Sequence, residues 1–173
     1  VHNRSRAAVN ELVAEGATAA FSPAEVARQV DVVFTNLPDS PDIEQVVLGP
    51  EGILQGAHPG LIWVDNSTIK PATAREVARR LAEAGVAALD APVSGGDIGA
   101  RNGTLAIMVG GPAEALETVR PVFEAMGKTI THVGDSGSGQ VAKAANQIMV
   151  AAQMVAMGEL LVLAQKTGAD PVK

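Results

Sequence analysis

The chain has 173 residues, of which 47% are hydrophobic and 2% aromatic, and its formal net charge is −6. The length suits one domain with an aliphatic core and some further structure. The absence of cysteine excludes disulfides and thiolate chemistry, and the acidic charge disfavours a nucleic-acid partner. Because the chain does not open with a signal-peptide pattern, we expect a soluble cytoplasmic protein without a membrane partner.

Short apolar segments alternate with helical segments along most of the chain. Apolar runs and period-two alternation predict strands at residues 1–4, 17–20, 31–36, 61–65, 86–90, 104–109 and 129–133. Amphipathic spacing, caps and prolines predict helices at residues 5–15, from 22 onward, and at 42–48, 71–84 and 112–126. Residues 49–60 are rich in glycine and proline and are predicted to form a connection without regular structure.

This alternation predicts an α/β fold with a Rossmann-like, doubly wound and mostly parallel sheet. We assign residues 1–134 to this dinucleotide-binding domain. Residues 135–173 are assigned to a long helix and the start of an all-α second domain, most of which would lie outside the chain. In such sheets ligands bind at the carboxyl ends of the strands, so the candidate site residues are sought there.

The long helix is predicted from about residue 140 to residue 165, with a stop at Gly168 and a new helix opened by Asp170 and Pro171. A helix that is apolar on nearly every side is expected to be buried on nearly every side. Because the chain ends as the next helix begins, we expect it to be a piece of a longer protein. Several polar side chains argue against a membrane span: Lys143, Asn146, Gln147, Gln153 and Glu159.

Two strand ends carry candidate ligand-binding turns. Ser94, Gly95 and Gly96 follow a predicted strand, and a concave turn of this kind exposes backbone N–H groups that can hold a carboxylate. The alternative is an ordinary glycine-rich loop, and the local sequence does not separate the two. Ser67 and Thr68 follow another strand, and there the local sequence favours a cap for the next helix.

The run Gly-Ser-Gly-Gln-Val-Ala at residues 137–142 fits a relaxed dinucleotide-binding fingerprint. Its context rejects that reading, because no second strand follows within a βαβ unit. What remains is Lys143 with Asn146 on the same helical face. A lone lysine on a helix is usually solvated, but this helix is otherwise apolar and Lys143 has small neighbours, so we favour a functional role.

Two separated motifs resemble those of the β-hydroxyacid dehydrogenase family. The first is Asp-Ala-Pro-Val-Ser-Gly-Gly at residues 90–96, and the second is Gly-x-Gly-x-x-x-Lys-x-x-Asn at residues 137–146. Within the family the chain is most similar to 2-hydroxy-3-oxopropionate (tartronate semialdehyde) reductases. That similarity lies in residues 98–101, 107–111, 127–131 and 145–148.

The resemblance implies an oxidoreductase that transfers a hydride between NAD(P)H and a small carboxylic acid. Lys143 would donate a proton or hydrogen bond to the reacting oxygen, and Asn146 would hold the same part of the substrate. Ser94, Gly95 and Gly96 would bind the carboxylate. The expected reaction is the reduction of 2-hydroxy-3-oxopropionate to glycerate.

Alternative activities stay open at this point. They are 3-hydroxyisobutyrate dehydrogenase, another semialdehyde or imine reductase of the superfamily, and a non-catalytic dinucleotide-binding module. The resemblance also implies a homo-oligomer for the full-length protein. Family members have an N-terminal Gly-x-Gly-x-x-Gly turn that this chain lacks, so the chain alone is expected to bind cofactor poorly and to turn over little substrate.

For the cofactor, the resemblance implies that Leu37, Pro38 and Thr68 line its site. NAD-selective sites place a carboxylate at the end of the second strand, where this chain has Asn3, Arg4 and Ser5. Arg4 suits a 2′-phosphate, so we predict NADP, with NAD as the alternative. No metal is predicted, because the three histidines lack metal-ligand spacing. These are His2, His58 and His132.

Overall fold

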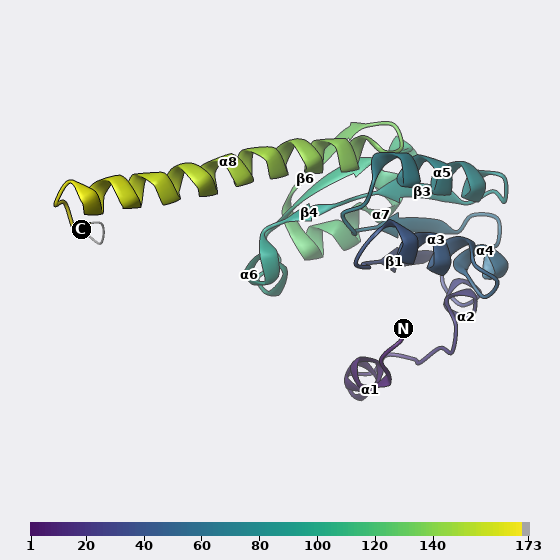
Figure 1. Cartoon of the computed structure of the whole chain (residues 1–173). Helices are drawn as coiled ribbons and strands as arrows, with labels where there is room; N and C mark the ends of the chain where they lie inside the picture. Colours follow the sequence, from purple (N-terminus) through teal and green to yellow (C-terminus); the bar gives the residue numbers. More distant parts are fainter. Residues whose placement is uncertain (171–173) are drawn as a thin grey trace.

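The computed structural model describes residues 1–170, and within them a mixed six-stranded sheet forms the centre of the molecule (Figure 1). The strands are β1 (Val32–Thr35), β2 (Ile62–Asp65), β3 (Ala87–Asp90), β4 (Val93–Ser94), β5 (Leu105–Gly110) and β6 (Gly127–Gly134). Their order is β1-β2-β3-β5-β4, and β6 pairs with β5. The predicted Rossmann-like, mostly parallel sheet is confirmed, since β1, β2 and β3 are mutually parallel and β5 is parallel to β6.

The strand β5 departs from the predicted succession of parallel strands, because it runs antiparallel to both β3 and β4. A parallel return requires a crossover of a dozen or more residues, usually through a helix that packs on the sheet. The helix between β3 and β5 has only six residues, Gly96–Arg101. The chain therefore returns in the opposite direction, and this reversal places β4 beside β5.

The helices follow the predicted order with two additions. They are α1 (Arg6–Ala14), α2 (Pro23–Ala27), α3 (Ser40–Leu48), α4 (Ile53–Gly56), α5 (Pro71–Ala82), α6 (Gly96–Arg101), α7 (Ala113–Met126) and α8 (Ser138–Lys166). The predicted helix start at residue 22 is confirmed, since Ser22 caps α2 and its hydroxyl accepts a hydrogen bond from Glu25 N. The sequence did not predict α4 or α6, which are short helices in segments rich in glycine.

The predicted strands at residues 1–4 and 17–20 are wrong. These segments are irregular, and two backbone hydrogen bonds join them, Val1 N to Thr18 O at 2.6 Å and Ala20 N to Val1 O at 2.9 Å. Both bonds use Val1 alone in the first segment, so they do not form a ladder. In Figure 1 this N-terminal part, with α1, lies beside the sheet rather than within it.

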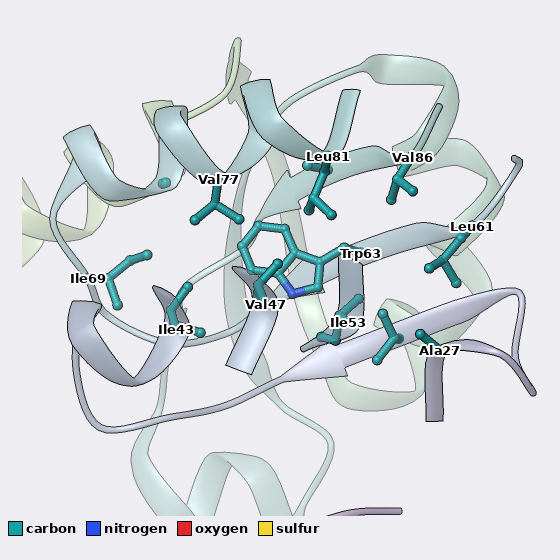
Figure 2. Packing of buried hydrophobic residues seen from close by; sticks show 13 residues of the cluster. Ala27, Ile43, Val47, Ile53, Leu61, Trp63, Ile69, Val77, Leu81 and Val86 are labelled. Carbon is teal, nitrogen blue, oxygen red and sulfur yellow. The ribbon is translucent and has the colours of Figure 1, made fainter. Parts of the chain in front are cut away.

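The side chains of β2 alternate between the two faces of the sheet and contribute to two apolar cores. Trp63 is 1% exposed and packs under α3 and α5, against Ile43 and Val77 among others (Figure 2). Burying an indole removes roughly 150–250 Å² from water, which stabilises the fold by about 4–6 kcal/mol at ~25 cal/mol per Å². On the opposite face Val64 packs with α7, including Phe123.

The helix α8 leaves the sheet after its first turns and projects away from the rest of the chain (Figure 1). The predicted stop is confirmed, because Gly168 follows α8 with φ 83°. Many of the large apolar side chains between residues 148 and 163 are exposed within residues 1–170, so the expectation of burial on nearly every side is wrong for this part of the chain. Nothing else in the described residues reaches far enough to cover the helix. The predicted helix from Asp170 and Pro171 lies outside the described residues.

Candidate active site

The first turn of α8 lies directly on the ends of β3 and β5, and two glycines permit this contact. Gly137 has φ 87°, and a Cβ added there would lie 2.8 Å from Arg75 Cγ. A Cβ on Gly139 would overlap the carbonyl oxygens of both Asp90 and Met108. A larger side chain at position 139 would therefore push the helix away from the sheet, and one at position 137 would collide with α5.

Asp90, the last residue of β3, caps this helix. Its Oδ1 accepts a hydrogen bond from Gly137 N at 2.6 Å, and its Oδ2 accepts one from Gln140 N at 2.9 Å. A carboxylate is favoured at a helix N-terminus because the free N–H groups there carry partial positive charge. Burial nevertheless raises the pKa of Asp90, against the opposing effect of these backbone donors. The cap fixes where the next turns of α8 lie.

Lys143 follows one turn later and is 9% exposed. Its Nζ donates a hydrogen bond to Val93 O at 2.8 Å, which places the ammonium group beside the residue that precedes Ser94. Burial lowers the pKa of Lys143, since the charged form loses hydration. The structure thus brings the predicted catalytic lysine to the predicted substrate turn.

Asn146 lies one further turn along α8 and is half-buried. Its Oδ1 is buried and has no hydrogen-bond partner within residues 1–170. A buried carbonyl oxygen without a donor costs about 1–3 kcal/mol. The side chain therefore offers an uncommitted acceptor on the turn after Lys143.

The predicted carboxylate turn begins in β4 and continues into α6. Ser94 is half-buried and pairs with Ala106 of β5, whereas Gly95 and Gly96 are exposed. The two glycines have φ values of 137° and 63°, which are conformations that favour glycine. Their backbone groups are thereby presented at the surface near Lys143.

The residues predicted to bind the cofactor lie at the ends of β1 and β2 and near α1. Leu37 is half-buried, and Pro38 and Thr68 are exposed at neighbouring strand ends. The turns that carry them are joined, because Leu37 N donates to Ser67 Oγ at 2.8 Å. Ser67 thus links the turns that follow β1 and β2, and it also precedes α5.

Asn3, Arg4 and Ser5 are exposed just before α1. The Arg4 side chain is 85% exposed and its Nη1 lies 3.8 Å from Asp42 Oδ1 in α3. This is a loose surface pair, of a kind that contributes little to stability. The guanidinium is therefore accessible.

Sequence reasoning missed the roles of Asp65, Asp90 and Gln140. Asp65 and Asp90 are paired residues at the ends of β2 and β3. Asp65 is fully buried; its Oδ1 accepts from Thr35 Oγ1 at 2.9 Å and from Ser67 Oγ at 2.6 Å. The available signal was an aspartate at the end of each of two apolar strands.

Residues 1–170 contain no group of three or more His, Cys, Asp or Glu side chains that could hold a metal ion.

The comparisons with known proteins match both parts of the chain. Residues 1–134 match the family described as the NAD binding domain of 6-phosphogluconate dehydrogenase. Residues 137–173 match the family described as NAD-binding of NADP-dependent 3-hydroxyisobutyrate dehydrogenase. The chain belongs to the β-hydroxyacid dehydrogenase family. The predicted family is thereby confirmed.

Named relatives of this β-hydroxyacid dehydrogenase chain include enzymes with different substrates. It is 46% identical over 164 residues to the 2-hydroxy-3-oxopropionate reductase of Escherichia coli (strain K12), covering 95% of this chain and 56% of the relative. It is 46% identical over 173 residues to a probable mitochondrial 3-hydroxyisobutyrate dehydrogenase of Dictyostelium discoideum, covering 100% of this chain and 54% of that protein.

Among solved structures, the Mycobacterium tuberculosis 3-hydroxyisobutyrate dehydrogenase with L-serine has a TM-score of 0.90 and 38% identity, covering 96% of this chain and 56% of that one. The chain thus spans little more than half the length of these relatives.

Proposed function

We propose that the protein containing this chain is an NAD(P)-dependent oxidoreductase that acts on a small β-hydroxyacid or the corresponding semialdehyde. The main observation behind the proposal is that Lys143 is buried and that its Nζ lies 2.8 Å from Val93 O, next to the Ser94 turn. The uncommitted Asn146 oxygen on the following turn supports the same site. A binding module without catalysis has no need of a desolvated lysine at this place.

In this proposal the chain's own residues hold the two ends of the substrate. Ser94 and the amides of Gly95 and Gly96 bind the carboxylate. Asn146 accepts a hydrogen bond from a substrate hydroxyl, and Lys143 faces the carbonyl oxygen. During reduction, a hydride adds to the carbonyl carbon and the π electrons move to oxygen. Lys143 then transfers a proton to the resulting alkoxide and recovers one from solvent.

A lowered pKa makes Lys143 a better proton donor than an ordinary lysine, because less free energy is needed to leave the amine neutral. In the oxidation direction the neutral amine accepts the proton from the substrate hydroxyl. The pH dependence of turnover is therefore expected to contain a group that titrates below the usual range of lysine.

The nicotinamide cofactor supplies or accepts the hydride when it is bound. The residues present fit part of its site, since the turns with Leu37 and Thr68 lie at adjacent strand ends. The exposed Arg4 guanidinium favours a 2′-phosphate, so we propose NADP as the preferred cofactor and NAD as the alternative.

For the substrate we propose 2-hydroxy-3-oxopropionate, reduced to glycerate, with 3-hydroxyisobutyrate as the alternative. The relatives named for these two substrates are equally identical to this chain, at 46%. Both substrates have a carboxylate and a reacting carbon that bears oxygen, so the Lys143 site suits either.

We propose that the apolar surface of α8 contacts protein rather than lipid. Its 29 residues have a mean hydropathy of 1.7 in their most apolar window, which is enough by length and composition alone to cross a membrane. However, Gln140 and Lys143 bind it to the domain, and the second family match covers it. We therefore propose a soluble, cytoplasmic protein whose remaining chain or second copy covers the apolar sides of α8. The domain division at residue 134 and homo-oligomer formation stay predictions.

The experiment is a steady-state comparison of the full-length protein with its Lys143→Met variant, followed by nicotinamide absorbance. Both candidate substrates are assayed with NADPH and NADH. We expect kcat to fall by roughly 10²–10⁴-fold in the variant, the usual contribution of a positioned proton donor. Cofactor binding, measured by protein fluorescence quenching, is expected to remain. Unchanged turnover in Lys143→Met would remove the basis of the proposal.

A further inference from the structure

Gln140 is a buried polar residue that the proposed chemistry does not use. It is 1% exposed and lies one helical turn before Lys143. Its Nε2 donates to Ser67 O at 2.8 Å, and its Oε1 accepts from Ile69 N at 3.0 Å. Both ends of the side-chain amide are therefore engaged by one turn of backbone, and that turn contains Thr68.

The same residue is tied to the neighbouring strand end. Gln140 N donates to Asp90 Oδ2 at 2.9 Å. Through Ser67 the network continues to the end of β1, because Ser67 Oγ accepts from Leu37 N at 2.8 Å. Three strand ends and the first turn of α8 are thus joined through hydrogen bonds that are buried or partly buried.

This network connects the two halves of the proposed site. Leu37 and Thr68 belong to the cofactor side, whereas Lys143 belongs to the substrate side. The Ser67–Ile69 turn is separated from Gln140 by 71 to 73 positions in sequence. The side chain of Gln140 therefore fixes a distance that local backbone structure does not set.

We propose that Gln140 is a positioning residue that holds the cofactor-side turn in register with Lys143. The inference rests on the proposed function and deepens it. Effective hydride transfer requires reacting groups within a few tenths of an ångström of their productive positions, and a misplacement of about 1 Å costs roughly 10²-fold in rate. A rigid amide bridge between the two sides supplies this precision.

The test uses the full-length protein with three substitutions. Gln140→Met keeps the length of the side chain and removes both the donor and the acceptor. Gln140→Glu keeps the acceptor for Ile69 N, and it donates to Ser67 O only when its carboxyl group is protonated. Gln29→Met is the matched control, because Gln29 is exposed near α2. For each protein, kcat, both KM values and the thermal midpoint are measured.

We expect Gln140→Met to lower kcat by roughly 10–10²-fold and to raise the KM for cofactor, while Gln29→Met behaves as the wild type. The kcat of Gln140→Glu, divided by that of the wild type at each pH, is expected to recover as the pH falls. Dividing by the wild type removes only the pH dependence that the two proteins share, and Asp65, Asp90 and Lys143 face the same region in both. Because a carboxylate at position 140 also acts on these groups, the ratio is read within the pH range where the kcat of the wild type is constant. If Gln140→Met does not fold, the Gln140→Glu ratio decides alone.

A purely structural role would give a different result. The thermal midpoint of Gln140→Met would fall while kcat and the KM for cofactor matched those of Gln29→Met, or the Gln140→Glu ratio would be flat with pH. Either outcome overturns the proposal. Failure of the proposed function is distinct, since it appears as full turnover in Lys143→Met whatever Gln140 does.

Discussion

Replacing Gly139 by alanine tests the close contact between α8 and the sheet. The added Cβ would overlap the backbone carbonyl oxygens of Asp90 and Met108 and lie 2.9 Å from Asp90 Oδ2. The two carbonyl oxygens belong to the backbone of strands and cannot rotate away. Overpacking of this kind costs about 1–3 kcal/mol, and a retreat of the helix would also weaken its bonds to the Asp90 carboxylate, each worth about 1.5–3 kcal/mol.

The gain in helix propensity from glycine to alanine offsets this by at most about 1 kcal/mol. We therefore expect Gly139→Ala to lower the free energy of unfolding by roughly 2–5 kcal/mol. The assay is urea denaturation followed by the fluorescence of Trp63, the one tryptophan of the chain, which is buried in the core.

Gly158→Ala on the same helix is the control. Within residues 1–170, no atom other than those of its chain neighbours and of the adjacent backbone of α8 lies within 4 Å of a Cβ added there. We expect it to change the free energy of unfolding of the 173-residue chain by less than about 1 kcal/mol, toward greater stability. Equal stability changes in Gly139→Ala and Gly158→Ala would refute the docking of α8 described above.

Three further outcomes are expected. Burial raises the pKa of Asp65 above 3.8, so its carboxyl stabilises the fold fully below that value and this contribution is lost as the pH rises. In urea titrations, the stability of the wild type relative to Asp65→Asn should therefore decrease from about pH 4 upward, and an increase would contradict the assignment. Arg4→Ala in the full-length protein should raise the KM for NADPH more than that for NADH; equal effects would leave Arg4 without a role in selectivity. Trp63→Ala should cost about 3–5 kcal/mol in urea denaturation followed by far-ultraviolet circular dichroism, since the variant has no tryptophan to follow, and a loss below about 1 kcal/mol would contradict its place in the core.

Much of the fold could be predicted because local signals agreed with the packing. The apolar run at residues 61–65 is β2, and the amphipathic helix predicted at residues 71–84 is α5, whose buried residues include Ala74, Val77 and Leu81. The antiparallel course of β5 was missed because direction depends on the connection and not on the strand's own residues. Exposure of α8 was missed because apolar periodicity indicates that a helix needs cover, not where the cover comes from.

For the site, the family resemblance implied that Lys143 and the Ser94 turn hold the same substrate, and the hydrogen bond from Lys143 to Val93 O agrees with it. The supporting residues were harder to find. Asp90 and Gln140 act through contacts across 47 to 73 positions of sequence, which no local pattern records. An aspartate that ends a strand reads like any turn residue until the helix that it caps is located.

A crystal structure of the full-length protein with NADP⁺ and a bound hydroxyacid would test the central claim most directly. We expect Lys143 Nζ within hydrogen-bond distance of the substrate oxygen on the reacting carbon, with the carboxylate on the Ser94–Gly96 turn. A substrate bound with its carboxylate elsewhere, or with Lys143 Nζ still held only by Val93 O, would contradict the account.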